Sequence, residues 1–289
     1  MTNESYSLLW IIDNNLAELL DRATWLETSA ELCNLGWQVT LVSPGFPNGD
    51  LDVRITTVRV PSPELYLVGR LIFQFLITLR IVFLSRDADI VLFHQYSGPF
   101  VLPQVLLRKI LRRSRPVFIM DSRTAPMDTT SIRGRLWMLY LEISRKMANR
   151  LADGQTSITQ RLARLQGMPD AKLMGVWPSG VKLDRFKQAS SLRCWPSEKD
   201  PLRLIYIGVL ARERNLSALI EAVLKVRSDG DKVELYLVGD GVQRTEIEEI
   251  VRKNNDGAIK LFPPVPPVEI PRILASAHVG VLPFPDFIY

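Results

Sequence analysis

The sequence predicts an α/β protein made of two domains, each built on a parallel β-sheet. Apolar segments of strand length alternate with longer segments of helical period, which is the pattern of parallel sheets covered by helices on both faces. The pattern lapses over residues 187–200 and then starts again. With 289 residues, of which 47% are hydrophobic, the chain is large enough for two cores. We expect a first domain over 1–186, a linker over 187–200 and a second domain over 201–289.

The first domain is predicted to alternate strands and helices. Strands are expected at 6–12, 37–43, 53–60, 89–93 and 116–120. Helices are expected at 18–36, 65–85 and 100–113, with another inside 133–154. A further helix, 158–167, should end at Gly167 in a left-handed conformation, and a strand and turn follow in 171–186.

The second domain repeats the same alternation. Its predicted strands are 202–208, 233–239, 258–262 and 278–284. Its predicted helices are 216–227, 243–254 and 268–276. The residues before it mix serine, proline and charged side chains without any period, as linkers do.

Charge and cysteine content limit the functional classes. The net charge of +5 suits anionic ligands or an anionic membrane surface and falls short of a nucleic-acid-binding arm. Cys33 and Cys194 stand outside any Cys-x-x-Cys or Cys/His pattern, so neither a disulfide framework nor a zinc site is indicated. The N-terminus lacks the basic and apolar regions of a secretory signal. We expect a reducing, cytoplasmic setting.

The most apolar stretch is 65–86, which Arg70 and Arg80 interrupt. It does not reach the roughly 18 uninterrupted apolar residues of a membrane-spanning helix. We therefore expect a buried or interfacial helix.

Two arginines, Arg212 and Arg214, stand between the first strand and the first helix of the second domain. Asn215 is the expected N-cap. The first N–H groups of a helix lack intrahelical partners and its dipole favours negative charge, so a phosphate is stabilised there. Guanidinium groups add bidentate hydrogen bonds. The alternative is that both arginines are surface charges paired with Glu213 or Glu221.

The next strand-to-helix junction contains Gly239 and Gly241 on either side of Asp240. Glycines at such a place permit a sharp turn or a close backbone approach. The junction resembles half of a dinucleotide-binding fingerprint, but Arg244 replaces its third glycine and no acidic residue lies near position 260, so a nicotinamide site is not indicated. A glycine turn without a ligand is the alternative.

Four segments in this order resemble the family 4 glycosyltransferases. They are PSGVKLDRF (178–186), YIGVLARERNLSALIEAV (206–223), LYLVGDG (235–241) and IKLFPPVPPVEIPRILASAHVGVLP (259–283). The resemblance covers most of the chain and implies a GT-B fold with two Rossmann-like domains. It also implies an enzyme that transfers a sugar, with retention, from a nucleotide-sugar donor to a glycan or lipid-linked acceptor.

The resemblance implies a site for the donor diphosphate in the second domain. Arg214 stands where the family has a lysine that binds the diphosphate, and Arg212 is expected to replace the family's arginine, whose position is Val209 here. The implied nucleotide and phosphate ligands are Gly208, Arg212, Arg214, Gly239, Gly241 and Val265, the last near the base. The nucleotide sugar is a substrate, and no cofactor or metal is expected.

The family also carries an E-x7-E segment whose glutamates hold the donor sugar, shortly after the strand that corresponds to 278–284. The sequence reaches Tyr289 before such a segment. We therefore expect an incomplete second domain with an exposed sheet edge, and a fragment with little transferase activity alone.

The acceptor side is expected in loops at the strand ends of the first domain. The candidates are Asp13, Asn14, Asn15, Asp121 and Arg123. His94 is the candidate acid–base or hydrogen-bonding group, because a histidine titrates near neutral pH. A structural histidine with satisfied hydrogen bonds is the alternative.

Membrane contact is a further expectation. The basic run 108–115, the helix with Trp137 and Tyr140, and the 65–85 segment together suit a headgroup layer at the inner face of an anionic membrane. The alternative is that the apolar stripes are core and the basic run is a solvated face.

Two other functions stay open from the sequence. One is a non-catalytic protein that binds a nucleotide or a partner and derives from such an enzyme. The other is a GT-B-fold sugar-nucleotide epimerase, which needs catalytic acids and a histidine.

Overall fold

The protein consists of two compact units, Met1–Val181 and Lys182–Tyr289. The computed structural model describes residues 5–19, 22–49, 51–63, 66–124, 131–180, 183–254 and 257–284. The division falls before the boundary expected at residue 186, because the next helix packs within the second unit.

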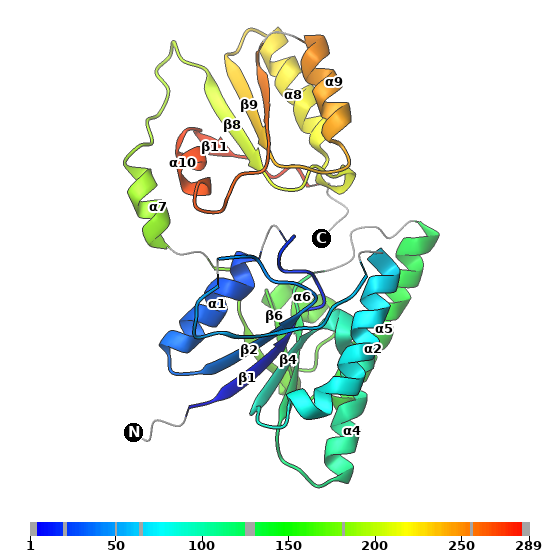
Figure 1. Cartoon of the computed structure of the whole chain (residues 1–289). Helices are drawn as coiled ribbons and strands as arrows, with labels where there is room; N and C mark the ends of the chain where they lie inside the picture. Colours follow the sequence, from blue (N-terminus) through cyan, green and yellow to red (C-terminus); the bar gives the residue numbers. More distant parts are fainter. Residues whose placement is uncertain are drawn as a thin grey trace. The chain divides into compact units, whose positions relative to one another are not determined.

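The first unit contains a seven-stranded parallel sheet (Figure 1). Its strands are β1 (Ser7–Ile11), β2 (Gln38–Ser43), β3 (Thr56–Arg59), β4 (Ile90–His94), β5 (Val117–Ser122), β6 (Gly154–Ser157) and β7 (Leu173–Val176). They are arranged in the order β3-β2-β1-β4-β5-β6-β7. The chain therefore builds outward from β1 in one direction and from β4 in the other. The carboxyl ends of β1 and β4 are the switch point at which such sheets bind ligands.

Helices cover both faces of this sheet. They are α1 (Ala23–Asn34), α2 (Tyr66–Leu84), α3 (Gly98–Val101), α4 (Pro103–Ile110), α5 (Ile132–Leu151) and α6 (Gln160–Leu165). Trp25 of α1 packs with Trp10 in the core on one face. Phe73 of α2, Val105 of α4 and Ala148 of α5 pack in the core on the other. The outward sides of α2, α4 and α5 therefore belong to the same face of the unit.

The second unit contains a four-stranded parallel sheet. Its strands are β8 (Leu202–Ile207), β9 (Val233–Val238), β10 (Ile259–Phe262) and β11 (Val279–Gly280), in the order β10-β9-β8-β11. Its helices are α7 (Leu183–Ser190), α8 (Leu216–Ser228), α9 (Arg244–Asn254) and α10 (Ile270–Ala275). Here the switch point lies between β8 and β11. The main core joins Leu235 and Leu237 of the sheet to Ile220 of α8 and Ile247 of α9.

The predicted elements differ from the observed ones in several places. The strand predicted at 278–284 is reduced to β11, and the helix predicted at 18–36 is shortened to α1. The helix expected at 100–113 is divided into α3 and α4, and Pro103 begins the second piece, since proline suits a first helical turn and not an interior. The strand β6 lacks an apolar pattern, although Gln155 and Ser157 in it are fully buried. The first residues of the expected linker form the end of α7, which buries Ala189 and packs against α10.

Glycines allow the first two loops of the second sheet to approach each other. Gly239 has φ +148°, and a Cβ there would lie 1.9 Å from the carbonyl oxygen of Gly208. Gly241 has φ +155°, and a Cβ there would lie 2.4 Å from the carbonyl oxygen of Leu210. The close approach is thus between two backbone segments, which supports the interpretation of this junction as a glycine turn. A backbone hydrogen bond from the Leu210 N–H to the Asp240 carbonyl oxygen also joins the two loops.

Gly239→Ala is expected to destabilise the second unit by about 1–3 kcal/mol or more, because it adds both a backbone clash and an unfavourable φ. Gly230→Ala is the matched control, since Gly230 also has positive φ (+105°) but nothing lies within 4 Å of its added Cβ. Urea denaturation followed by fluorescence measures both. Equal losses in the two variants would show that the contact with Gly208 does not constrain the fold.

Candidate functional site

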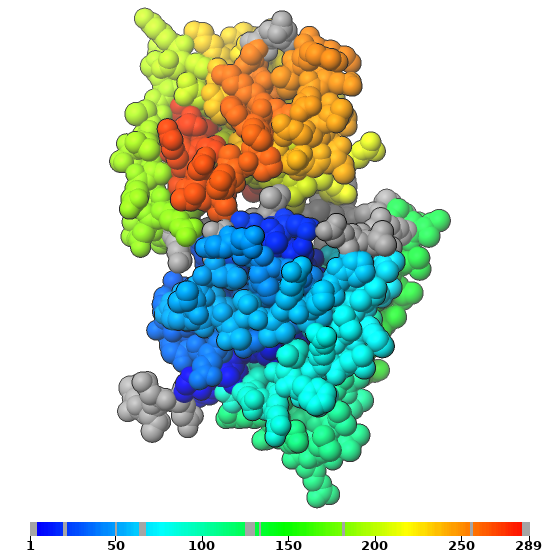
Figure 2. Space-filling view, viewed as in Figure 1, coloured from blue at the N-terminus to red at the C-terminus, as the bar shows by residue number. Residues whose placement is uncertain are grey.

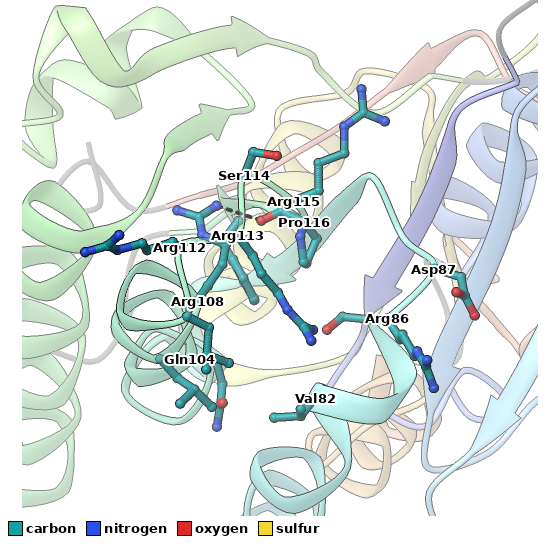
Figure 3. A pocket seen from close by; sticks show the side chains of 14 residues that line it. Val82, Arg86, Asp87, Gln104, Arg108, Arg112, Arg113, Ser114, Arg115 and Pro116 are labelled. Carbon is teal, nitrogen blue, oxygen red and sulfur yellow. Dashed lines mark hydrogen bonds between the residues drawn. The ribbon is translucent and has the colours of Figure 1, made fainter.

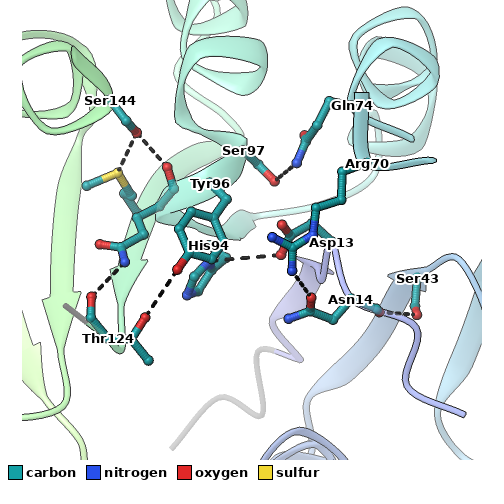
Figure 4. Close-up of polar contacts among 12 residues, drawn as sticks. Asp13, Asn14, Ser43, Arg70, Gln74, His94, Tyr96, Ser97, Thr124 and Ser144 are labelled. Atoms are coloured by element: carbon teal, nitrogen blue, oxygen red, sulfur yellow. Dashed lines mark hydrogen bonds and ion pairs between the residues drawn. The ribbon is translucent and has the colours of Figure 1, made fainter. Parts of the chain in front are cut away.

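Three titratable side chains, those of Asp13, His94 and Asp121, lie at the carboxyl ends of neighbouring strands of the first sheet. Figure 4 shows two of them, Asp13 and His94, beside each other. His94 ends β4 and pairs in register with Asp121 of β5. Asp13 follows the neighbouring β1, whose Ile11 pairs with Phe93. Parallel register therefore brings together residues that are 81 and 27 positions apart in the chain (13 to 94, 94 to 121).

The pair of His94 and Asp13 is buried and incompletely satisfied. The His94 Nδ1 atom lies 3.9 Å from the Asp13 Oδ1 atom, and the side chains are 14% and 1% exposed. At this distance the two groups attract each other without a hydrogen bond. Among the described residues, both Asp13 carboxylate oxygens and the His94 Nδ1 atom have no hydrogen-bond partner. Buried polar atoms of this kind need an explanation, and a bound ligand or water provides one.

Burial lowers the pKa of His94 below its ordinary value of 6.5, while the charges of Asp13 and Asp121 act in the opposite direction. The imidazole is therefore neutral at pH 7 and can both donate and accept a hydrogen bond. His94 also contacts Tyr96 edge-on, with ring centroids 4.5 Å apart. A purely structural histidine would have hydrogen-bond partners for its ring nitrogens, whereas the His94 Nδ1 atom has none in the described structure.

Asp121 and Arg123 form a second buried pair beside it. The Arg123 Nη1 atom lies 3.4 Å from the Asp121 carboxylate, and Thr156 donates a 2.7 Å hydrogen bond to the same carboxylate. Burial raises the pKa of Asp121. Arg123 also donates to Ser179 and stacks 4.2 Å from the centroid of Trp177. Arg123 thereby connects β5 to the PSG turn that the sequence analysis singled out.

The two asparagines after β1 differ in what they contact. Asn14 accepts a 2.6 Å hydrogen bond from Arg70 at the start of α2, and Arg70 lies over the Tyr96 ring. Asn15 is turned toward its own loop, where its amide contacts Ala17 and Glu18. Of the predicted acceptor-side residues, Asp13, Asn14, Asp121 and Arg123 are therefore brought to the His94 region, while Asn15 shapes the loop. Arg70 was missed as a site residue, although an arginine inside an apolar helix was a usable signal.

An aromatic cluster lies behind His94. Tyr140 of α5 donates a short hydrogen bond to the carbonyl oxygen of Tyr96, and Trp137 stacks on Tyr140 with a centroid distance of 5.3 Å. Trp137 also contacts Tyr96. Burial raises the pKa of Tyr140 well above its usual range. Tyr140 therefore supports Tyr96, which contacts His94. The Tyr140 hydroxyl is thus bound inside the unit, whereas the sequence had suggested a place for Tyr140 on a membrane-facing surface.

The second unit presents its own site at the carboxyl end of β8. Tyr206 is buried, and its hydroxyl donates a 2.8 Å hydrogen bond to the Val209 carbonyl oxygen. The Gly208 N–H donates to Val238, and the Leu210 N–H donates to Asp240. These bonds hold the loop that leads to the arginines. No pattern in the sequence had indicated a role for Tyr206.

Arg212 and Arg214 form a single 3₁₀ turn that is followed directly by α8. Asn215 stands at the N-cap position with a left-handed φ of 54°, and its side chain makes no capping hydrogen bond in the described structure. This corrects the expectation of a side-chain cap. The first N–H groups of α8 therefore remain available to an anion.

The charges of both arginines are also available. Within the described ranges, neither Arg212 nor Arg214 has an ion-pair partner, so the alternative pairing with Glu213 or Glu221 is not observed. The Arg214 guanidinium stacks 4.8 Å from the centroid of Phe284, which follows β11. This contact holds the guanidinium at the switch point between β8 and β11.

The remaining predicted donor residues lie at the same edge. Gly239 and Gly241 form the neighbouring loop. Val265 packs its side chain against Ile205 and Val238 in a small core cluster. Val265 thus positions the segment after β10, whose backbone was the predicted contact with a nucleotide base.

In the part of the chain that the structure describes, no group of three or more His, Cys, Asp or Glu side chains is arranged to hold a metal ion. The helices in the same ranges include none with the length and apolarity needed to cross a membrane.

Solved structures of low sequence identity share this fold. Anabaena HepE, solved in complex with UDP-glucose, has a TM-score of 0.60 at 13% identity, covering 95% of this chain and 72% of HepE. WaaG, a glycosyltransferase involved in lipopolysaccharide biosynthesis, has a TM-score of 0.64 at 12% identity, covering 96% and 75%. A Listeria monocytogenes protein proposed to be a UDP-N-acetylglucosamine 2-epimerase has a TM-score of 0.57 at 14% identity, covering 96% and 73%. These likenesses show a GT-B fold, which transferases share with this proposed epimerase.

Family comparison separates these possibilities. No curated protein sequence matches the chain. The family model described as "Glycosyl transferases group 1" matches residues 201–286. The family model described as "Glycosyltransferase Family 4" matches residues 23–185, which is more than half of the chain. The chain therefore belongs to the family 4 glycosyltransferases.

Proposed function

We propose that this glycosyltransferase takes a sugar from a nucleoside-diphosphate donor held by the second unit and transfers it, with retention, to a glycan or lipid-linked acceptor held by the first. The observation that carries the proposal is the junction of β8 and α8. There, two arginines without ion-pair partners in the described ranges precede a helix whose N-terminus has no side-chain cap.

The junction suits a diphosphate for electrostatic reasons. The N–H groups at the start of α8 and the positive end of its dipole favour an anion. Arg212 and Arg214 add two positive charges at the same place. Charge that develops on the leaving diphosphate is thereby stabilised without reorganisation of the protein. The UDP and UDP-glucose complexes of HepE support this class of donor. Because the arginines supply the compensating charge, the proposed reaction needs no metal.

The edge of the first sheet suits an acceptor hydroxyl. Both carboxylate oxygens of Asp13 and the Nδ1 atom of His94 are buried, and none of them has a hydrogen-bond partner within the described structure. A sugar hydroxyl that donates to Asp13 would remove this deficit. Asn14 and Arg70 adjoin these groups and supply further donors and acceptors.

A lipid-linked acceptor requires the protein to reach a membrane surface. The outward side of α2 carries large exposed apolar residues along its whole length, including Leu71, Phe75, Leu79 and Phe83. We propose peripheral contact with an anionic membrane from the cytoplasmic side, through this face. The net charge of +5 favours such a surface.

Arg214→Ala and Arg212→Ala are each expected to weaken binding of UDP or the cognate nucleoside diphosphate by about tenfold to a hundredfold, since each removes a charge-assisted hydrogen bond. Arg214→Lys should recover only part of the affinity, because an ammonium cannot bind bidentately. Isothermal titration calorimetry with a panel of nucleoside diphosphates measures the effect.

Lys225→Ala is the control for this test, because it removes the same charge from an exposed position in the last turn of α8. Its affinity should equal that of the wild type. If Arg214→Ala and Lys225→Ala bind alike, the arginine junction is not the donor site.

The imidazole of His94 is expected to titrate below pH 6.5, and Asp13→Asn should lower its pKa further because the carboxylate favours the protonated ring. The chain contains two histidines, so NMR of the ring Cε1–H signals resolves His94, with His278→Gln completing the assignment. Because folding depresses this pKa, the unfolded state takes up the proton first, and the free energy of unfolding should decrease as the pH falls below about 6.5.

An increase of the His94 pKa in Asp13→Asn would contradict the proposed pairing. The variant Asp121→Asn provides a comparison, since Asp121 acts on His94 in the same direction with a smaller effect.

A further inference from the structure

An arginine-rich pocket lies at the opposite edge of the first sheet from His94. It has a volume of about 490 Å³ and is bounded by the end of α2, by α4 and by the segment leading into β5 (Figure 3). The segments 85–87 and 114–116 precede β4 and β5, so this pocket is at their amino ends. It is therefore distinct from both sites described above.

Five arginines line the pocket, and two of them are neutralised. Arg108 is paired with Asp153 at 2.7 Å, and Arg115 is paired with Asp89. The other three, Arg86, Arg112 and Arg113, have no ion-pair or hydrogen-bond partner for their side chains among the described residues. Among the described residues of the lining, Asp87 supplies the only carboxylate. The lining thus keeps an excess of positive charge.

One buried nitrogen atom in the lining lacks a hydrogen-bond acceptor. Arg108 is only 9% exposed, and its Nε atom is buried without a partner in the described structure. Figure 3 shows Arg113 reaching toward Val82 and Arg86 across the pocket. A buried guanidinium nitrogen without an acceptor is costly, and a bound oxyanion would satisfy it.

Arg112 holds a conformation that its side chain does not favour. It follows the end of α4 with φ 51°, a left-handed position where helices usually place glycine. An arginine there costs stability relative to glycine. A residue that is kept despite such a cost often has a functional role, and for Arg112 we infer that its guanidinium binds a ligand.

Exposed apolar side chains adjoin the pocket. Phe83 of α2 is 80% exposed, and Ile110 of α4 is 77% exposed. Leu107 and Leu111, which line the pocket, are also exposed. In Figure 2 the outer side of α2, coloured cyan, is open on the surface of the first unit. Basic groups beside an apolar rim match an amphiphile with an anionic head, whereas nucleic acid would leave the apolar rim in water.

We propose that this pocket binds the phosphate of an anionic phospholipid headgroup, while Phe83 and Ile110 enter the acyl layer beside it. The proposal rests on the membrane contact proposed above and is independent of the sugar transfer. It gives that contact a specific position and a ligand chemistry.

The double variant Arg112→Gly/Arg113→Gln tests the pocket. Glycine suits the left-handed φ of Arg112, so the fold should keep or gain thermal stability. Cosedimentation is measured with phosphatidylcholine vesicles that contain or lack phosphatidylglycerol. The wild type should bind the anionic vesicles, and the double variant should bind them at least roughly tenfold more weakly. Arg252→Gln/Lys253→Gln, on α9, removes the same charge outside the pocket and should leave binding almost unchanged.

Each other outcome is decisive. If the wild type does not bind anionic vesicles, both the membrane contact and this inference are wrong, while the nucleotide-binding test is unaffected. If the double variant binds as well as the α9 control, the membrane contact stands and the pocket is not its ligand site. If glycerol phosphate stabilises the wild type but not the double variant, and both bind vesicles equally, the pocket takes a free phosphate ester and the lipid assignment is wrong.

Discussion

Parallel strand pairing is the constraint on which both sites depend. The strand pairs in both sheets are parallel. Within each sheet, the strands therefore end at one edge, where residues distant in sequence meet. The pairing of β1 with β4 brings Asp13 to His94, and the pairing of β8 with β11 brings Phe284 under Arg214. A change of register would separate both pairs. The arrangement of both candidate sites therefore depends on backbone hydrogen bonds as much as on their side chains.

The two sites solve different electrostatic problems. In the first unit, charged and titratable groups are withdrawn from water, so burial lowers the pKa of His94 and raises that of Asp121. Asp121 accepts hydrogen bonds from Thr156 and Arg123, whereas the Asp13 carboxylate and the His94 Nδ1 atom have no hydrogen-bond partner in the described structure. In the second unit, Arg212 is exposed and Arg214 is held against an aromatic ring. In the proposed function, this positive charge faces a diphosphate that brings its own negative charge. We therefore propose that the first site selects hydroxyl groups and that the second selects anions.

The face formed by α2, α4 and α5 has a separate physical character. Its inner side supplies Phe73, Val105 and Ala148 to the core, while its outer side leaves large apolar residues exposed. A helix that is apolar on both sides needs a second apolar environment. Arg70 near one end of α2 contacts Asn14, a proposed acceptor-side residue, and Arg86, just after the other end, lines the arginine pocket. The same helix therefore connects the proposed acceptor site to the proposed lipid site.

The sequence by itself determined the α/β class, most of the helices and strands, the family and the arginine junction, because these follow from local periodicity and from motifs of fixed spacing. It did not determine β6, whose polar residues are buried by neighbours on both sides, nor the supporting role of Tyr206. It also left open whether His94 was satisfied, and whether Arg212 and Arg214 were paired. Those properties depend on which groups the folded chain places within a few ångströms of each other, and only the tertiary structure decides such distances.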